Sequence, residues 1–258
     1  MLLVCDIGNT NIVFGIFKND LLTFQFRIST RINRSSDEYG VILLTLLREF
    51  DISRDNIDDV IIASVVPPLT FHIENSFRKY FQIEPISINS DFDLGIINKY
   101  DLPSQVGLDR LVNAVAGFTK YKKALILIDL GTATTLDVIS SKGEYLGGVI
   151  IPGITISKEA LANNASKLPK VDIQVPPSVV GKNTDHSIQS GLTYGYASMI
   201  DGLITKISKE YKDESFRVIA TGGLATIIYN ISENIDELDK DLTLNGLNII
   251  YKRNKIKQ

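Results

Sequence analysis

Short apolar runs separated by turn residues open the chain and predict an antiparallel meander. Residues 1–6 form an apolar run that ends in Asp6. A Gly-Asn-Thr-Asn turn follows, and residues 12–17 then have the pattern of a second strand. The turn signal Asn19-Asp20 precedes residues 21–28, which we predict as a third strand.

Apolar positions then take on a helical spacing. Residues 37–49 place leucine and valine every three or four positions, which predicts an amphipathic helix with Ser36 or Asp37 as its N-cap. A buried strand is predicted at residues 60–66, where two prolines end it. Two further helices are predicted in this half, one at residues 69–80 and one that begins near Asp109.

The same order of elements then begins again. Residues 124–128 form an apolar run that ends in Asp129, and a Gly-Thr-Ala-Thr turn leads into further apolar runs. The predicted strands are residues 135–139, 145–151 and 216–220, and the predicted helices are residues 155–168 and 187–210. Asp6 and Asp129 are 123 residues apart, so the period is far too long for a solenoid and indicates a duplicated domain.

We therefore expect an α/β protein of two duplicated domains, residues 1–118 and 119–258. Each should contain a mixed sheet with a three-stranded antiparallel meander flanked by helices. A doubly wound dinucleotide-binding fold fits less well, because it requires a helix directly after the first glycine turn. Residues 12–17 have the pattern of a strand instead.

Composition narrows the class of protein. The chain has 258 residues, of which 44% are apolar, and a net charge of -3, which argues against general nucleic-acid binding. A single cysteine, Cys5, excludes an internal disulfide and fits a core position in a protein of the reducing cytoplasm. No signal peptide or membrane span is expected, and the basic tail Lys252–Lys257 is expected to be a frayed end.

The first candidate site is the turn Asp6-Ile7-Gly8-Asn9-Thr10-Asn11. Successive backbone N–H groups in such a turn cradle phosphate oxygens, and the Asn and Thr side chains add donors. A carboxylate repels phosphate, so Asp6 would hold Mg²⁺ against the phosphates, directly or through water. An ordinary hairpin turn would explain this motif alone equally well.

The second candidate is Asp129-Leu130-Gly131-Thr132-Ala133-Thr134-Thr135, which repeats the pattern with hydroxyl groups. Two such turns facing each other would grip one triphosphate, and Asp129 would bind a second cation. A third motif, Thr221-Gly222-Gly223, follows a predicted strand and would let the adenosine of ATP lie against the backbone, although such a pair is often only a turn.

These three motifs, in this order, resemble the phosphate-1, phosphate-2 and adenosine signatures of the actin, hexokinase and Hsp70 superfamily. The resemblance covers the whole chain. A P-loop sequence is absent, and so are the HRD and DFG sequences of protein kinases.

Further motifs narrow the resemblance to type III pantothenate kinases. Gly107-Leu108-Asp109-Arg110 follows Pro103, and Gly147-Gly148-x-Ile150-x-Pro152-Gly153 follows the second phosphate turn. The other blocks are Gly181-x-Asn183-Thr184, Ser190-Gly191 and Leu242-Thr243-Leu244-Asn245-Gly246-Leu247. The family resemblance implies ATP-dependent phosphorylation of the primary hydroxyl of pantothenate to 4′-phosphopantothenate, the first step of coenzyme A biosynthesis.

The resemblance also implies roles for residues. Asp109 would be the catalytic base, and Arg110 would offer its fork of donors to the pantothenate carboxylate. By resemblance, Asp129 would hold a monovalent cation, K⁺ or NH₄⁺, beside Thr132. The residues implied to contact pantothenate are Tyr100, Gly107, Leu108, Asp109, Arg110 and Thr184. Those implied to bind ATP are Asp6, Ile7, Gly8, Asn9, Thr10, Asn11, Ile12, Val13 and Thr132.

Two positions depart from the family pattern. Leu108 stands where alanine is frequent, and His186 stands where a smaller residue is frequent, although a surface histidine is the simpler explanation. Without the resemblance, Asp109 would be explained as a helix-start aspartate favoured by the helix dipole. The family pattern also implies a homodimer, for which the apolar stretch Leu192–Ile207 is a candidate surface.

Two other functions remain open from the sequence. An exopolyphosphatase-like phosphohydrolase or a small sugar kinase of the same superfamily would keep both phosphate turns without needing the Asp109 block. A transcriptional accessory protein is a non-enzyme alternative, but the negative net charge and the absence of a helix-turn-helix pattern count against contact with DNA.

Overall fold

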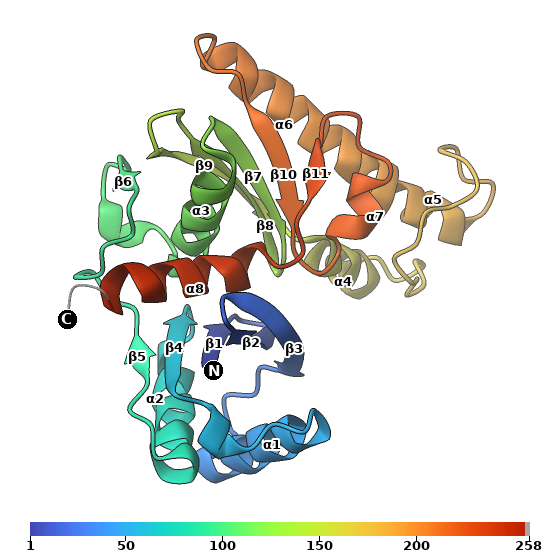
Figure 1. Cartoon of the computed structure of the whole chain (residues 1–258). Helices are drawn as coiled ribbons and strands as arrows, with labels where there is room; N and C mark the ends of the chain where they lie inside the picture. Colours follow the sequence, from blue (N-terminus) through green and yellow to red (C-terminus); the bar gives the residue numbers. More distant parts are fainter. Residues whose placement is uncertain (256–258) are drawn as a thin grey trace. The chain divides into compact units, whose positions relative to one another are not determined.

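A computed structural model describes residues 1–255, which fold into two compact units (Figure 1). Unit 1 contains residues 1–95, 104–116 and the chain from residue 242, and unit 2 contains residues 96–103 and 117–241. These units differ from the two sequential halves that the sequence suggested. Residues 96–103 belong to unit 2, and the last helix belongs to unit 1, where its apolar residues Leu244, Leu247 and Ile250 are buried.

Unit 1 is built on a five-stranded sheet in the order β3-β2-β1-β4-β5. Strands β1, β2 and β3 form the predicted antiparallel meander, and β4 and β5 run parallel to β1. The strands of unit 1 are β1 (Leu2–Ile7), β2 (Asn11–Lys18), β3 (Leu21–Ser29), β4 (Asp59–Ser64) and β5 (Ile86–Ser87).

Helices pack on both faces of this sheet. Alternate residues of β1 point to opposite faces: Leu3 and Cys5 join the core made with α1 and α2, while Val4 faces Gly15 and Leu244 of α8. The helices are α1 (Ser36–Glu49), α2 (Pro67–Ser76), the first part of α3 (Leu108–Tyr121) and α8 (Leu242–Lys255), with 3₁₀ turns at Arg54–Asn56 and Pro103–Gln105. Burial raises the pKa of the Cys5 thiol well above its usual value, as expected of a core cysteine.

The start of α1 corrects one prediction. The N-cap is Ser35, not Ser36 or Asp37: its side chain accepts from the Glu38 N–H, and the Glu38 side chain accepts from the Ser35 N–H. This reciprocal capping box is the S-x-x-E pattern, which the sequence contains one residue before the predicted cap.

Unit 2 repeats the topology of unit 1. Its sheet has the order β11-β10-β7-β8-β9-β6, in which β7, β8 and β9 form the second meander and β10 and β11 are parallel to β7. The strands are β6 (Ile97–Asn98), β7 (Leu125–Leu130), β8 (Ala133–Ile139), β9 (Glu144–Pro152), β10 (Arg217–Thr221) and β11 (Glu237–Leu238). Only β6, added beside β9, has no counterpart, so the duplicated α/β fold is confirmed.

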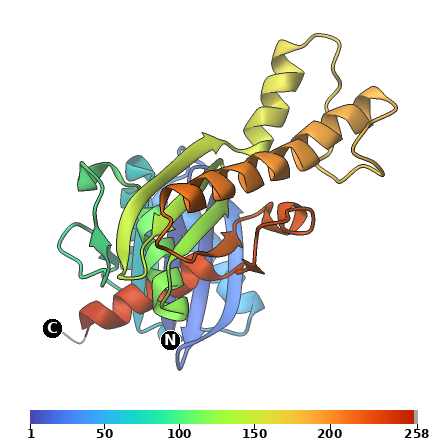
Figure 2. The same ribbon diagram turned by 90° about the horizontal axis from the view of Figure 1, so that it is seen from above.

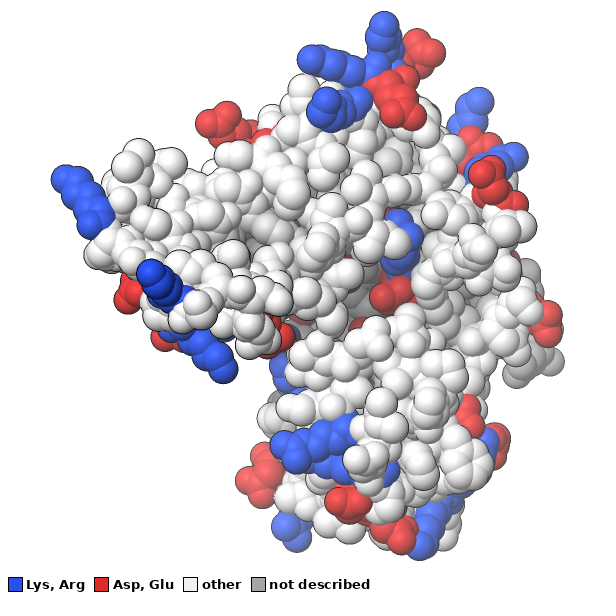
Figure 3. All heavy atoms as spheres, turned by 180° about the vertical axis from the view of Figure 1, so that it is seen from behind, with Lys and Arg blue, Asp and Glu red and all other residues white. Residues whose placement is uncertain are grey.

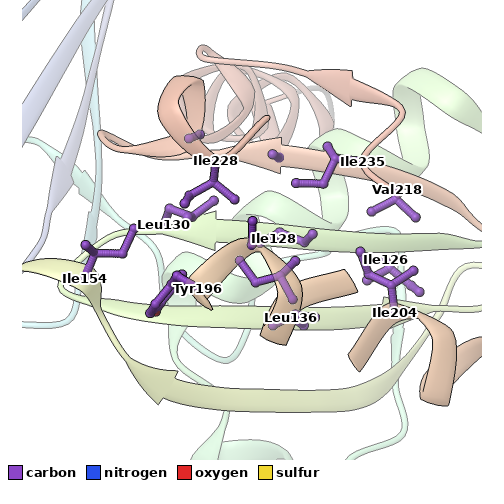
Figure 4. Packing of buried hydrophobic residues seen from close by; sticks show 14 of the residues in the cluster. Ile126, Ile128, Leu130, Leu136, Ile154, Tyr196, Ile204, Val218, Ile228 and Ile235 are labelled. Atoms are coloured by element: carbon purple, nitrogen blue, oxygen red, sulfur yellow. The ribbon is translucent and has the colours of Figure 1, made fainter. Parts of the chain in front are cut away.

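The core of unit 2 lies between the sheet and α6 (Figures 2 and 4). Ile126 and Ile128 of β7 pack with Ile200 and Ile204 of α6, while Leu125 and Leu127 face Gly117 on the opposite side. The helices are α4 (Ile154–Asn164), α5 (Thr184–Ser190), α6 (Tyr196–Glu210) and α7 (Ala225–Tyr229).

Two predicted long helices are interrupted. The helix predicted over 69–80 is α2 followed by a π-helical turn at Phe77–Phe81, and the one predicted over 187–210 is α5, a π-helical turn at Gly191–Gly195, and α6. The chain stays helical through each π-helical turn, so the apolar pattern of the sequence did not show where the α-helix is interrupted.

The basic tail is not frayed where the structure describes it. Lys252 forms an ion pair with Asp20, and Lys255 with Asp59, at 2.6 Å each. These residues therefore continue α8 as part of unit 1, and Lys257 lies outside the described residues. Figure 3 shows a face on which acidic and basic side chains are interspersed between wide uncharged areas. Within residues 1–255, no helix is both long and apolar enough to cross a membrane.

Candidate active site

The first phosphate turn connects β1 to β2 in unit 1. The β1–β2 ladder ends at the pair Ile7 and Ile12, and the Gly8 N–H then donates to the Asn11 carbonyl at 3.0 Å. A Cβ atom at Gly8 would lie 3.1 Å from that carbonyl oxygen, so glycine permits the tight turn. Asn9 and Thr10 are exposed at the tip, where their donors can meet a ligand.

Thr30, which the sequence analysis did not single out, closes this turn. Its N–H donates to the Thr10 carbonyl at 2.9 Å, and its hydroxyl donates to the Gly8 carbonyl at 2.6 Å. Thr30 follows the last residue of β3, and β3 pairs with β2 up to Ser29 and Asn11. The meander pattern alone places the end of β3 beside the start of β2, and that signal was available in the sequence.

Asp109 lies in the first turn of α3, also in unit 1. Its Oδ1 accepts from the Arg110 N–H at 2.9 Å, and the Arg110 N–H is directed to the Gly107 carbonyl as well, at 3.1 Å. A Cβ atom at Gly107 would lie 2.5 Å from Asp109 Oδ1, so only glycine leaves room for the carboxylate in this orientation. Asp109 and Leu108 are half-buried, and Arg110 is buried.

The helix that carries Asp109 is held by close contact with α8. The Asn113 side chain is buried and accepts from the Thr243 hydroxyl at 2.7 Å. A Cβ atom at Gly246 would overlap the Val112 carbonyl oxygen. The near-terminal block Leu242–Leu247 therefore has a structural role in unit 1, because it lets α8 approach α3 without steric conflict.

The second phosphate turn connects β7 to β8 in unit 2, and two glycines pack against it. The Gly131 N–H donates to the Ala133 carbonyl at 3.2 Å. A Cβ atom at Gly153 would overlap the Thr132 carbonyl oxygen, and one at Gly222 would lie 2.6 Å from Asp129 Oδ1. The segments that contain Gly153 and Gly222 lie far from this turn in the sequence, and both pack against it in the structure.

Gly222 has a φ of +100°, a conformation that favours glycine. Gly153 is the N-cap of α4, and the preceding Pro152 carbonyl accepts from the buried Tyr196 hydroxyl at 2.7 Å. Burial raises the pKa of this phenol, so it stays a donor through the physiological range. The β9–α4 junction is therefore tied to α6, which fixes Gly153 against the phosphate turn.

Tyr100, predicted to contact pantothenate, is half-buried in unit 2 beside β9. Its ring lies 6.4 Å from that of Tyr145, centroid to centroid, and a Cβ atom at Gly147 would be in ordinary van der Waals contact with it. The buried Tyr145 hydroxyl donates to Asp137 at 2.6 Å, and the Thr135 hydroxyl donates to the same carboxylate at 3.0 Å. Asp137 and Tyr145 had no role in the sequence analysis, although both lie in strands that it predicted.

Thr184 is the first residue of α5 and is exposed. Asn183 caps the helix by accepting from the His186 N–H at 2.8 Å, and Gly181 packs so closely that a Cβ atom there would overlap the Ser187 N–H. The half-buried His186 side chain lies 3.4 Å from the Asn183 amide. His186 thus belongs to the capping turn, and the block Gly181–Thr184 shapes the start of α5.

Two hollows of unit 1 lie away from these motifs. One, of about 480 Å³, is lined by residues 44–54, and the other, of about 640 Å³, lies between α1 and α2 beside Phe71 and His72. His72 is 3.4 Å from the Ser36 hydroxyl, which fits a structural histidine. The motifs, rather than these hollows, are the better guide to the chemistry, because they combine glycine turns of a kind suited to phosphate with a positioned carboxylate.

The comparisons with known proteins now identify the family. A sequence model of type III pantothenate kinases matches residues 2–206. The chain belongs to the type III pantothenate kinase family. Type III pantothenate kinases from Citrifermentans bemidjiense and Anaeromyxobacter dehalogenans are 50% and 48% identical to it over 255 residues, which cover 99% of this chain and 100% of each relative.

Solved structures support the fold of this kinase. The activator of 2-hydroxyisocaproyl-CoA dehydratase from Clostridium difficile, solved with ADPNP, has a TM-score of 0.54 at 13% identity and covers 99% of this chain and 95% of that one. A Baf family transcriptional activator from Campylobacter jejuni has a TM-score of 0.59 at 21% identity, with 98% and 99% covered. Both likenesses concern the fold alone, and neither favours a regulatory function.

Family membership confirms the resemblance stated from the motifs. The chain is an enzyme, an ATP-dependent kinase, and phosphorylation of pantothenate in coenzyme A biosynthesis is its reaction. The roles of individual residues are a separate question, which rests on the geometry described above.

Proposed function

We propose that Asp109 is the catalytic base for transfer of the γ-phosphoryl group of ATP to pantothenate. The observation that carries this proposal is the fixed carboxylate at the start of α3: one oxygen accepts from the Arg110 N–H, and Gly107 leaves space beside it. The second oxygen is then the one that takes the proton of the substrate hydroxyl. A bond forms between this hydroxyl oxygen and the γ-phosphorus as the bond to the β-phosphate oxygen breaks, giving ADP and 4′-phosphopantothenate.

Pantothenate would be held mainly by groups suited to its carboxylate and its chain. The Arg110 guanidinium offers a bidentate fork to the carboxylate. Gly107 and Leu108, which precede Asp109 in the chain, are further proposed contacts, and the Leu108 side chain is larger than the alanine frequent at this position. Tyr100 and Thr184 of unit 2 complete the set of proposed contacts.

ATP would occupy the two phosphate turns. The residues proposed to contact it are Asp6, Ile7, Gly8, Asn9, Thr10, Asn11, Ile12, Val13 and Thr132. Asp6 would hold Mg²⁺, directly or through water. Among residues 1–255, no group of three or more His, Cys, Asp or Glu side chains is placed to hold a metal. Mg²⁺ bound with a nucleotide usually takes most of its ligands from phosphate oxygens and water.

Asp129 would hold the monovalent cation, K⁺ or NH₄⁺, beside Thr132. Its carboxylate supplies the hard oxygen that such a cation requires, and the close packing of Gly222 against Asp129 Oδ1 fixes that oxygen. The cation would supply positive charge near the phosphates, and the protein residues would position it.

We also propose a homodimer located in the cytoplasm. The helical stretch Leu192–Ile207 is not a suitable dimer surface, because Leu192, Ile200 and Ile207 are buried in the core of unit 2. Figure 2 shows α4 and the segment that follows it projecting at one end of unit 2. Exposed apolar residues on β9, α4 and this segment make a better candidate: Ile150, Ile156, Leu161, Val175, Val179 and Val180.

The activity is tested by incubating the protein with ATP, Mg²⁺, K⁺ and pantothenate. We expect ADP and 4′-phosphopantothenate in equal amounts, measured by coupled assay and mass spectrometry. A folded sample that forms no ADP above background contradicts the proposal. Phosphate release from polyphosphate would favour the phosphohydrolase alternative, and binding to nonspecific DNA that weakens steeply with salt would favour the regulator.

A further inference from the structure

Thr30, the residue that follows β3, has no role in the reaction proposed above. Thr30 contributes both its N–H and its hydroxyl to the first phosphate turn, at the Thr10 and Gly8 carbonyls. Two hydrogen bonds from one residue to two carbonyls of a four-residue turn restrict the turn as a unit. The contacts all lie within unit 1.

The bond to the Gly8 carbonyl sets the direction of a phosphate donor. The Gly8–Asn9 peptide is trans, as are all the described peptide bonds, so its C=O and N–H point in opposite directions. Because the Gly8 carbonyl points at Thr30, the Asn9 N–H points away from Thr30. The Gly8 N–H is already directed to the Asn11 carbonyl, so the Asn9 amide is the first backbone donor of the turn that a phosphate can use.

Thr30 is itself held from the core of unit 1. The next residue, Arg31, is bonded through its carbonyl to the Tyr39 hydroxyl at 2.9 Å, and its N–H lies 3.4 Å from the same oxygen. Tyr39 is fully buried on α1. A continuous set of contacts therefore leads from the α1 core through Arg31 and Thr30 to the phosphate turn.

We propose that Thr30 is a positioning residue for ATP, which fixes the Gly8 carbonyl so that the Asn9 N–H is presented to a phosphate oxygen. This inference rests on the proposed role of residues 6–13 in ATP binding. Thr30 does not touch the reacting atoms. Its effect should therefore fall on the affinity for ATP and leave the affinity for pantothenate unchanged.

The test compares Thr30→Val, which replaces the hydroxyl with a methyl group of similar size, with Thr30→Ser, which keeps the hydroxyl. We expect Thr30→Val to raise the KM for ATP roughly fivefold to tenfold, the effect of one hydrogen bond. The KM for pantothenate should stay within about twofold, since no pantothenate contact changes. Thr30→Ser should restore the KM for ATP, and Tyr39→Phe should raise it by a smaller factor, because Tyr39 acts through Arg31.

The chain offers a matched control in Thr23. This residue lies on β3, the strand that precedes Thr30, and its hydroxyl donates to the Ile16 carbonyl of β2 at 2.9 Å, away from the phosphate turn. Thr23→Val removes the same kind of bond from the same strand pair and should leave both KM values unchanged. Thermal unfolding with and without ATP, in the absence of pantothenate, gives a binding measurement that does not depend on turnover.

The possible results distinguish a failure of the role proposed for Thr30 from a failure of the proposed ATP site. If the unmodified protein neither turns over nor is stabilised by ATP, the proposed ATP site fails. If it does both, but Thr30→Val has a normal KM for ATP, only the role of Thr30 fails. The role of Thr30 is also overturned if Thr30→Ser is as impaired as Thr30→Val. The same holds if the KM for ATP and the KM for pantothenate change in parallel. If Thr30→Val does not fold, Thr30→Ala and Tyr39→Phe decide by the same criteria.

Discussion

The two phosphate turns have the same topology but are stabilised by different means. Each joins the first two strands of a meander and begins two residues after an aspartate. The β1–β2 turn is held by a polar side chain, Thr30, whereas the β7–β8 turn is held by the close approach of Gly153 and Gly222. The two turns share a backbone path, and the contacts described here differ: side-chain and backbone hydrogen bonds from Thr30 at the first, and close packing of two glycines at the second.

The difference has a consequence for substitutions. A hydrogen bond can be lost at a cost of about 1 kcal/mol, and water can replace part of it at an exposed turn. A backbone contact that leaves no space for a methyl group has no such substitute, because atoms must move to relieve the overlap. The second turn should therefore be the less tolerant of the two.

The largest effect is expected at Asp109, which belongs to neither turn. If the turns bind ATP and Asp109 takes the proton, Asp109→Asn should lower kcat by roughly 10²- to 10⁴-fold. The KM for ATP should change little. Steady-state kinetics on a sample with an unchanged circular dichroism spectrum measures this, and near-normal turnover would remove Asp109 from the base role.

Gly153→Ala should be the more damaging of two matched glycine substitutions. The new Cβ overlaps the Thr132 carbonyl, so the free energy of unfolding should fall by about 1–3 kcal/mol and the KM for ATP should rise. Gly8→Ala, with 3.1 Å to the Asn11 carbonyl, should cost less. Chemical denaturation and kinetics measure both effects.

Gly202→Ala is the control for these glycine substitutions. Gly202 lies in α6, and apart from its chain neighbours and the backbone of its own helix no described atom lies within 4 Å of an added Cβ. This change should therefore stabilise the protein by roughly 0.5–1 kcal/mol, the helix preference for alanine over glycine. Equal losses at Gly8 and Gly153 would contradict the proposed difference between the turns.

We expect Asp6 and Asp129 to bind different cations. Activity in K⁺ should exceed activity in Na⁺ several-fold, and Asp129→Asn should remove this difference, since Asp129 is the proposed monovalent ligand. Asp6→Asn should keep the preference for K⁺ but require more Mg²⁺. Titrations of each cation on the three proteins measure this, and full activity in Na⁺ alone would rule out the role given to Asp129.

The smallest effect concerns stability at acid pH. Hydrogen bonds from Tyr121 and Arg217, together with Lys120, lower the pKa of Glu237 from 4.5 to about 2. The folded state therefore favours the carboxylate, so this contribution is present above about pH 4.5 and is lost as the pH falls toward 2. Since Glu237 is partly exposed, solvent screens the effect and it should be modest.

The measurement is the free energy of unfolding as a function of pH, with Glu237→Gln for comparison. Glutamine keeps the shape but cannot ionise, so the loss of stability between about pH 4.5 and 2 should be shallower in the variant. Identical slopes in the two proteins would show that Glu237 contributes nothing to the acid transition.

The parts of the fold predicted from sequence are those specified by local patterns. Both meanders, the helix near Asp109 and the strand before Gly222 were predicted within a few residues, because period and turn residues reside in the local sequence. The two-residue strands β5, β6 and β11 gave no such signal, and α8 was recognised only as a block of the family pattern. Short strands form because a neighbouring strand offers hydrogen bonds, which the sequence does not show.

The residues of the candidate site also fall into two groups, those recognised from local sequence and those brought together by the fold. The sequence by itself determined the aspartates, the glycine turns and the Asp109-Arg110 block, since chemistry requires those residue types at that spacing. Only the tertiary structure placed Thr30 against Gly8, Gly153 against Thr132 and Gly222 against Asp129. These contacts join segments remote in sequence, and whether a methyl group fits between two backbones depends on distances that no local pattern contains.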